Sequence, residues 1–168
     1  MEKNIVLIGM MGSGKTTVGK LLAQRLRRPF VDTDALIEER EGRSIPDIFE
    51  QDGEEFFRTL ERKLSRELSG KSGLVIACGG GLPTRREAIA ALKQNVLVFW
   101  LDRDPGETYD SLNVSHRPLA RSGRGDFIRR YQDRAPVYLC WSDHIVRAEN
   151  PQAASDLVAA ICSEVSEP

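Results

Sequence analysis

The sequence predicts an α/β fold in which a parallel β-sheet is covered by helices on both faces. Short apolar runs alternate along the chain with segments that repeat apolar residues every three or four positions. The runs are mostly continuous rather than alternating, which is typical of parallel strands buried on both faces. A repeated order of strand then helix leads to a parallel sheet joined by right-handed crossovers.

The expected elements follow from these two periodicities. Five runs are predicted strands: residues 4–8, 29–31, 74–78, 96–101 and 144–146. Helical faces are predicted on three segments, formed by Val18, Leu21, Leu22 and Leu26, by Phe56, Phe57, Leu60, Leu64 and Leu68, and by Leu157, Val158 and Ile161. Thr84 and Glu87 have the spacing of a capping box, and Asn150 precedes a proline suited to the first turn of a helix.

Length and composition limit the class of protein. A chain of 168 residues is expected to form one domain, residues 1–168, around a single core. The net charge of -1 gives no overall field that would attract nucleic acid or an anionic membrane. Cys78, Cys140 and Cys162 are odd in number and lack C-x-x-C spacing, which argues against a disulfide framework or a zinc site.

The apolar runs also bear on location. None approaches the roughly 20 residues that a membrane-spanning helix needs, and the N-terminus lacks the order of a signal peptide. We therefore expect a soluble cytoplasmic protein without membrane partners.

The segment "GMMGSGKT", residues 9–16, lies between the first predicted strand and the first predicted helix. It fits the pattern G-x-x-x-x-G-K-[ST] in the context that this motif requires. Backbone N–H groups of such a loop surround phosphate oxygens, and the following helix directs its positive end at them. Lys15 would bridge the β- and γ-phosphates, and Thr16 would offer its hydroxyl to Mg²⁺. The alternative is a glycine-rich turn with a solvated lysine.

Asp32 and Asp34 follow the second predicted strand. If the backbone stays extended, both carboxylates point to one side and Thr33 points away. At the carboxyl end of a parallel sheet they would lie near the phosphate-binding loop. One could hold Mg²⁺ and the other could accept or orient the proton of an attacking hydroxyl. The alternative is that either aspartate caps a helix that begins near Ala35.

Three further features are candidates with open alternatives. Arg58 lies on a predicted helix, in a position where most arginines are solvated. Gly79, Gly80 and Gly81 follow a buried strand and indicate close backbone approach to a ligand, or a plain turn. The basic segment 113–125 could close over phosphates, or could be a flexible loop.

Six motifs together resemble shikimate kinases. They are "GMMGSGKTT", "DTD", "FFRTLE", "CGGG", "HRPLA" and "RAPVY", and their order and spacing match that family over nearly the whole chain. The resemblance implies a three-layer P-loop NTPase fold with a five-stranded parallel sheet in the order 2-3-1-4-5. It also implies that the γ-phosphate of ATP is transferred, with Mg²⁺, to the 3-hydroxyl of shikimate on the route to the aromatic amino acids.

The resemblance assigns roles residue by residue. The implied catalytic residues are Lys15, Asp34 and Arg117. The implied ATP-binding residues are Gly12, Ser13, Gly14, Lys15, Thr16, Thr17, Arg117 and Pro151. The implied substrate-binding residues are Asp34, Arg58, Gly79, Gly80, Gly81 and Arg134. Thr16 and Asp32 would hold Mg²⁺. Glu61 would orient Arg58, and Ile45, Phe49 and Phe57 would form the wall under the ring. A substrate-binding helical segment at about 33–62 and a mobile lid at about 112–125 are also implied.

The sequence departs from the family pattern at the adenine end of the nucleotide. Asp110 and Glu149 occupy positions where the family usually has basic residues, and the lid reads "RPLA" rather than R-P-L-L. Since an aspartate cannot stack on adenine as arginine does, we expect weaker or less selective adenine binding. Tyr109 or Pro151 could supply an apolar surface instead.

Two other functions stay open at this point. One is a P-loop kinase of another small hydroxylated metabolite, such as gluconate. The other is a catalytically silent nucleotide-binding paralogue. The leading prediction is a shikimate kinase that binds ATP and shikimate, acts as a monomer and has no nucleic acid partner.

Overall fold

The computed structural model describes residues 2–112 and 122–166, and its centre is a five-stranded sheet. The order is β2-β3-β1-β4-β5 and the pairings are parallel. The strands are β1 (Asn4–Ile8), β2 (Phe30–Asp32), β3 (Val75–Ala77), β4 (Val96–Leu101) and β5 (His144–Val146). The predicted fold class and strand order are therefore confirmed.

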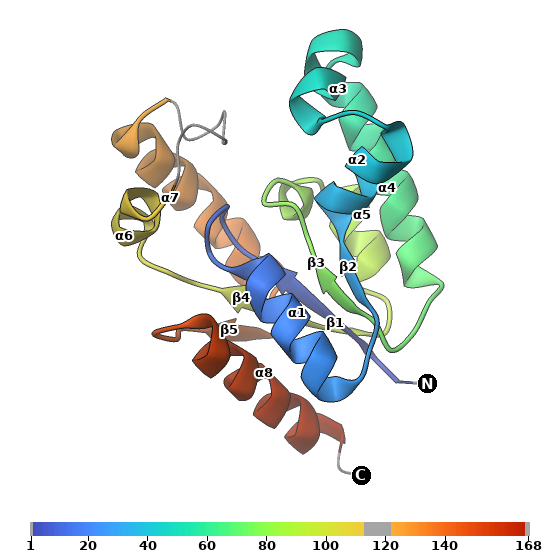
Figure 1. The fold of residues 1–168 in the computed structure, drawn as a ribbon, viewed down its shortest axis with the longest axis vertical. Helices are drawn as coiled ribbons and strands as arrows, with labels where there is room; N and C mark the ends of the chain where they lie inside the picture. Colours follow the sequence, from blue (N-terminus) through green and yellow to red (C-terminus); the bar gives the residue numbers. More distant parts are fainter. Residues whose placement is uncertain (1, 113–121, 167–168) are drawn as a thin grey trace.

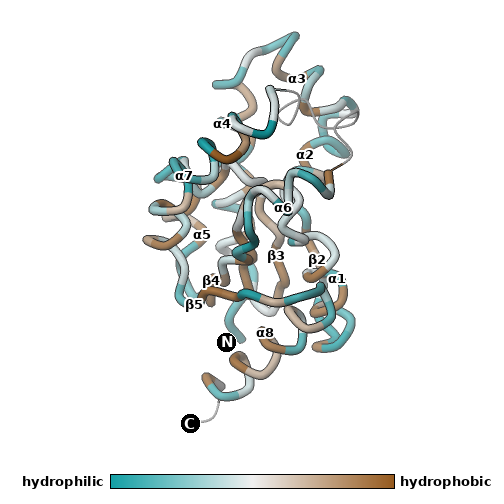
Figure 2. The backbone as a smooth tube through the Cα atoms, turned by 90° about the vertical axis from the view of Figure 1, so that its left-hand side faces the viewer, coloured by the Kyte–Doolittle hydropathy of each residue, from teal (hydrophilic) through white to brown (hydrophobic). Residues whose placement is uncertain are grey.

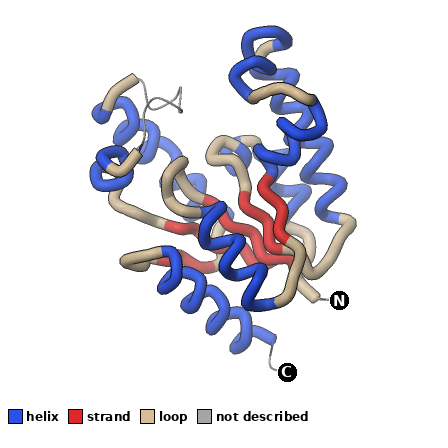
Figure 3. Tube along the Cα trace, in the orientation of Figure 1, coloured by secondary structure: helices blue, strands red, loops and turns tan. Residues whose placement is uncertain are grey.

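Helices cover both faces of this sheet (Figure 1). The helices are α1 (Lys15–Leu26), α2 (Thr33–Glu41), α3 (Ile45–Asp52), α4 (Glu54–Ser69), the short 3₁₀ helix η1 (Leu82–Thr84), α5 (Arg86–Leu92), α6 (Pro105–Asp110), α7 (Arg124–Trp141) and α8 (Pro151–Ser166). Figure 3 shows the strands enclosed between helical layers, with α2 and α3 extending beyond the end of the sheet. None of the described helices is long and apolar enough to cross a membrane.

The two faces of β1 belong to two separate cores. Ile5 and Leu7 pack with Val18 and Leu22 of α1 and with Val158 of α8. The alternate residues of β1 face the other layer, where the second core includes residues of α4, α5 and α7. Because both faces are buried, the strand has no polar face, which explains its continuous apolar sequence. Figure 2 shows the strands as predominantly hydrophobic and the outer turns as hydrophilic.

The element ends differ from the predicted ones in identifiable places. The second strand ends one residue later than predicted, at Asp32, and the third is confined to Val75–Ala77. The capping box predicted at Thr84 is wrong, because Thr84 lies in η1 and its hydroxyl donates to Gly81 O at 2.5 Å. The predicted cap before Pro151 is confirmed, since Asn150 Oδ1 accepts from Ala153 N–H at 2.8 Å.

Candidate active site

The phosphate-binding loop connects β1 to α1 at the carboxyl end of the sheet. Gly12 and Gly14 adopt φ angles of 78° and 95°, and α1 begins immediately afterwards at Lys15. Lys15 Nζ donates to the carbonyl oxygens of Gly9 and Met10, both at 2.8 Å. The loop therefore curves around the lysine, and the positive end of α1 opens onto the space beside it.

A cavity of about 570 Å³ joins this loop to the other predicted groups. Its lining includes Gly12, Gly14, Lys15, Thr16, Thr17, Asp32, Asp34, Gly79, Gly80 and Pro151. Several predicted residues that the structure describes are outside this lining: Ser13, Ile45, Phe49, Phe57, Arg58, Glu61, Gly81, Tyr109 and Arg134. The volume is in the range of small-molecule sites. One continuous space therefore connects the nucleotide side to the predicted acceptor side.

The two aspartates differ in position because the backbone does not stay extended after β2. Asp32 ends the strand and caps α2, with Oδ1 accepting from Ala35 N–H at 3.1 Å. Its Oδ2 accepts from the hydroxyl of Thr16 at 2.7 Å. Asp34 lies within the first turn of α2. The expectation of an extended segment through Asp34 is wrong, and the capping alternative applies to Asp32.

Gly79 brings the loop after β3 against the start of α2. Its N–H donates to the buried hydroxyl of Thr33 at 2.9 Å. A Cβ at Gly79 would overlap the carboxylate of Asp34, with Asp34 Cγ at 2.8 Å. Only a residue without a side chain allows this approach, so the first glycine of the triplet holds Asp34 at the cavity wall.

The surroundings of Asp34 favour its neutral form. Burial raises the pKa of Asp34 to about 6, and the nearby Asp32 carboxylate adds to the increase, while Lys15 opposes it. The folded chain thus keeps a carboxylate partly desolvated beside the phosphate-binding loop. Such perturbed groups in clefts are common at catalytic sites.

This pKa gives a prediction for stability in the absence of Mg²⁺ and nucleotide. In the unfolded chain Asp34 loses its proton near pH 3.8, whereas the folded chain holds it to about pH 6. Ionisation therefore destabilises the fold progressively between these values and by a constant amount above them. We expect Asp34→Asn to raise the melting temperature at pH 7.5, with a gain that shrinks as the pH falls toward about 4. Asp133→Asn, at an exposed position of α7, is the control, and a gain independent of pH would contradict the account.

Arg58 is buried rather than solvated. It is 8 % exposed, and its Nη1 donates to Glu61 Oε2 at 2.7 Å, where Glu61 is 1 % exposed. Burial raises the pKa of Glu61, and the guanidinium of Arg58 works against that increase. Glu54 accepts from Arg58 Nη2 at 3.1 Å and from Arg85 Nη2 at 3.0 Å. The guanidinium is therefore fixed in one orientation by two carboxylates.

The glycine triplet also lies next to both predicted carboxylate-binding arginines. A Cβ at Gly81 would lie 2.9 Å from Arg58 Nη1, and one at Gly80 would lie 3.4 Å from Arg134 Nη1. The hydroxyl of Tyr138, one turn after Arg134 on α7, donates to Gly80 O at 2.7 Å. Each glycine thus borders a different polar group of the predicted acceptor site: Asp34, Arg134 and Arg58, in that order.

The predicted apolar wall lies beside this group. Phe49 and Phe57 make an edge-to-face contact with ring centroids 5.2 Å apart. The guanidinium carbon of Arg58 lies 5.3 Å from the centroid of Phe57. Ile45 packs against the same core. A cation held over an apolar surface suits a small carboxylate with a hydrocarbon ring.

The predicted lid is described only in part. Arg117 lies outside the described residues, as do residues 113–121. Arg124 and Gly125, which were expected in the lid, already belong to α7. Asp110 accepts from Arg124, with Nε–Oδ1 at 3.0 Å and Nη2–Oδ2 at 3.3 Å. Pro151 lines the cavity, whereas Tyr109 packs on Phe127 with ring centroids 5.6 Å apart.

The comparisons with known proteins agree with this geometry. The shikimate kinase family model matches residues 11–166. The chain belongs to the shikimate kinase family. It is 46% identical over 137 residues to the shikimate kinase of Sulfurihydrogenibium sp., covering 81% of this chain and 82% of that protein. It is 36% identical over 168 residues to that of Dehalococcoides mccartyi, covering 99% and 93%.

Solved structures of the shikimate kinase family show the same fold. The shikimate kinase from Acinetobacter baumannii, in complex with shikimate, superposes with a TM-score of 0.90 at 32% identity, covering 99% of this chain and 97% of that one. The shikimate kinase from Aquifex aeolicus gives 0.83 at 33% identity, covering 97% and 98%.

Several contributing residues were not predicted from the sequence. Thr33 was expected to point away from the site, yet its hydroxyl receives the N–H of Gly79. Tyr138 anchors Gly80, and Glu54 links Arg58 to Arg85. These contacts join segments 46 to 58 residues apart for the two glycines, so no local pattern indicates them. The tyrosine of the "RAPVY" motif, one turn after Arg134, is the signal that could have indicated one of them.

Proposed function

We propose that this chain transfers the γ-phosphate of ATP to the 3-hydroxyl of shikimate. The observation that carries the proposal is the triplet Gly79–Gly81, which borders Asp34, Arg134 and Arg58 and also reaches the cavity of the phosphate-binding loop. Membership of the shikimate kinase family supports the same conclusion. Because one chain supplies all of these groups, we propose that the active form is a monomer.

On the nucleotide side, Lys15 and the N-terminus of α1 would bind the phosphates. Lys15 Nζ donates to two loop carbonyls, so its charge lies within the loop. When ATP binds, Lys15 would exchange these partners for β- and γ-phosphate oxygens. The phosphates would also be bound by the rest of the loop and the start of α1: Gly12, Ser13, Gly14, Thr16 and Thr17. Pro151 would border the base of ATP.

The residues present fit Mg²⁺. The hydroxyl of Thr16 and the carboxylate of Asp32 lie 2.7 Å apart at the cavity wall and offer only oxygen ligands. The described residues hold no group of three or more metal-ligating acidic, histidine or cysteine side chains. Magnesium is commonly bound by one or two protein oxygens together with phosphate and water. When bound, Mg²⁺ would neutralise charge on the phosphates.

On the acceptor side, Asp34 would accept a hydrogen bond from the attacking hydroxyl. Its carboxylate is held against Gly79 and would direct the oxygen at the γ-phosphate. Phosphoryl transfer passes through a loose transition state that needs little activation of the nucleophile. We therefore propose that Asp34 orients the hydroxyl first and receives its proton late, while positioning and charge neutralisation supply most of the rate.

Arg58 and Arg134 would bind the carboxylate of shikimate, and this assignment tests the function. A charge-assisted hydrogen bond contributes about 1.5–3 kcal/mol, or roughly 10- to 150-fold in affinity. We expect Arg58→Ala to raise the KM for shikimate by about that factor and to leave the KM for ATP nearly unchanged. Both constants can be measured by coupled detection of ADP.

Two controls keep this test decisive. Arg62→Ala removes a cation from the same helix, where Arg62 pairs with Glu87 at 3.7 Å, and should change neither constant. Arg134→Ala tests the proposed carboxylate contact without leaving Glu61 buried and unpaired. An unchanged KM for shikimate in both Arg58→Ala and Arg134→Ala would refute the assignment of these arginines to the carboxylate. ADP formation by the wild type with gluconate but not with shikimate would favour the alternative kinase, and ADP with neither would favour the silent paralogue.

A further inference from the structure

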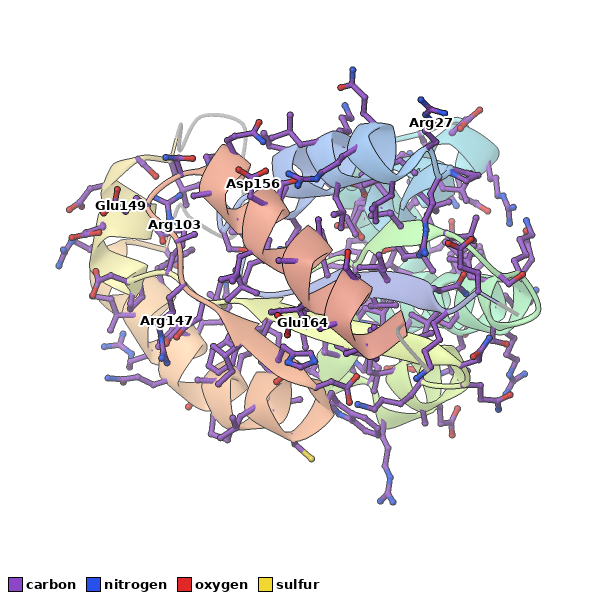
Figure 4. The ribbon with its side chains drawn as sticks, turned by 90° about the horizontal axis from the view of Figure 1, so that it is seen from below. Arg27, Arg103, Arg147, Glu149, Asp156 and Glu164 are labelled. Carbon is purple, nitrogen blue, oxygen red and sulfur yellow. The ribbon has the colours of Figure 1, made fainter. Side chains whose placement is uncertain are left out.

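Arg103 lines the cavity of the phosphate-binding loop on the side away from Asp34, because β1 and β3 separate β4 from β2 in the sheet. It follows β4 and precedes α6, and it lines the cavity together with Ser111, Leu112 and Pro151. Figure 4 shows it between α6 and the segment that leads into α8. Among the described lining residues, Lys15 and Arg103 are the basic side chains. Lys15 is within the phosphate loop, which follows β1, whereas Arg103 follows the neighbouring strand β4, away from β2 and Asp34.

Three aspartates near Arg103 in the chain have other hydrogen-bonding partners. Both oxygens of Asp102 accept hydrogen bonds, from the Tyr131 hydroxyl at 2.8 Å and from Arg147 Nε at 2.9 Å. Asp104 caps α6, accepting from Glu107 N–H at 2.9 Å. Asp110 is bonded to Arg124. These three carboxylates are thus directed to other groups. Glu107 and Glu149 line neighbouring cavities together with Arg103, and Arg103 itself also lines the cavity of the phosphate-binding loop.

The hydrogen bond from Arg103 to the loop bears on which part of a nucleotide Arg103 contacts, the phosphates or the base. Its Nη1 donates to Gly12 O at 3.3 Å. In a phosphate-binding loop the backbone N–H groups turn toward the phosphates. Arg103 therefore borders this loop at the Gly12 carbonyl. Arg103 also lines the two neighbouring cavities, which contain Glu149 and Ala148 but not Lys15.

We propose that Arg103 is a positioning residue for the nucleotide, whose planar guanidinium packs on the purine base of ATP beside Pro151. The proposal rests on the proposed function and deepens it, because it assigns the base contact that Asp110 does not provide. A guanidinium over an aromatic face is attracted by its π electrons, and its planarity allows stacking that an ammonium cannot reproduce.

The test is calorimetric titration of the full chain with two probes, Mg²⁺-ATP and Mg²⁺-tripolyphosphate, which has phosphates but no base. We expect Arg103→Gln to weaken ATP binding about five- to thirtyfold and to leave tripolyphosphate binding unchanged within about twofold. Arg103→Lys should weaken ATP binding nearly as much, since it restores the charge without the planar surface.

Arg25→Gln is the matched control. It makes the same charge change on α1, at an exposed position paired with Asp156 and outside the described lining of the three cavities, so both affinities should be unchanged. Equal losses for both probes, full rescue by lysine, or no loss for ATP would each overturn the base contact. The titrations contain no acceptor, so their outcome does not depend on shikimate. A chain that binds ATP but does not phosphorylate shikimate would refute the proposed function, while the titrations alone would still decide the role of Arg103.

Discussion

Lys15→Ala is expected to lower the turnover number for shikimate-dependent ADP formation by at least about a thousandfold. The reason is geometric: Lys15 is the first residue of α1, and its ammonium is held within the loop by the carbonyls of Gly9 and Met10. In that position it can follow the negative charge that moves from the γ-phosphate to the leaving oxygen. A neutral side chain leaves this charge to the backbone dipoles.

The effect of Lys15→Ala can be separated from a loss of folding. Lys20→Ala removes a lysine from an exposed position of the same helix and should retain wild-type turnover. Thermal unfolding, measured beside the turnover number, shows whether Lys15→Ala is folded at the assay temperature. A decrease below tenfold in a folded variant would show that Lys15 is not part of the reaction.

Asp34→Asn is expected to lower the turnover number by about a hundredfold, the low end of the range of a general base, because Asp34 orients the hydroxyl and receives its proton late. An amide keeps the size of the side chain against Gly79 but cannot accept the proton of the attacking hydroxyl. The KM for ATP should change little, since Asp34 lies on the acceptor side. Steady-state kinetics at saturating Mg²⁺-ATP measures both constants.

The control for Asp34→Asn is Glu39→Gln, which makes the same change at an exposed position of α2. It should have wild-type turnover. A loss below tenfold in Asp34→Asn would remove any essential role for this carboxylate. The same substitution is expected to stabilise the fold above about pH 6. We therefore expect Asp34→Asn to have a lower turnover number and a higher melting temperature than the wild type.

The fold was predictable because its signals are local. Continuous apolar runs and the three-to-four-residue spacing between them define a parallel sheet with two buried faces, and the glycine-rich loop marks the joint of β1 and α1. The strand order came from the resemblance. The errors lie at element ends, where side-chain capping sets the first residue of a helix. Asp32 rather than Asp34 caps α2, and Thr84 belongs to a 3₁₀ helix.

The sequence named the residues of the proposed acceptor site, but it did not indicate how they are held together. The motifs named Asp34, Arg58, the triplet and Arg134, yet they gave no reason why three glycines are needed together. The structure supplies it at Gly79, where a side chain would displace Asp34. The burial of Arg58 with Glu61 was also hidden, because an i, i+3 pair has the same sequence pattern on an exposed and on a buried helix face.

The departure from the family pattern at Asp110 can be placed in the structure. Asp110 suggests a missing contact when it is considered alone. In the structure Asp110 accepts hydrogen bonds from Arg124. Arg103, seven residues earlier in the chain, lines the cavity that we propose to hold the nucleotide. Position in sequence does not determine which strand end or helix supplies a charge to a shared cavity.

The most direct test of the central claim is the position of the phosphate in the product. Wild-type chain is incubated with Mg²⁺-ATP and shikimate, and the product is examined by phosphorus and proton NMR. The account predicts one phosphate monoester per ADP, coupled to the proton on carbon 3 of shikimate. Phosphate on another hydroxyl, or ADP accompanied only by inorganic phosphate, would contradict it.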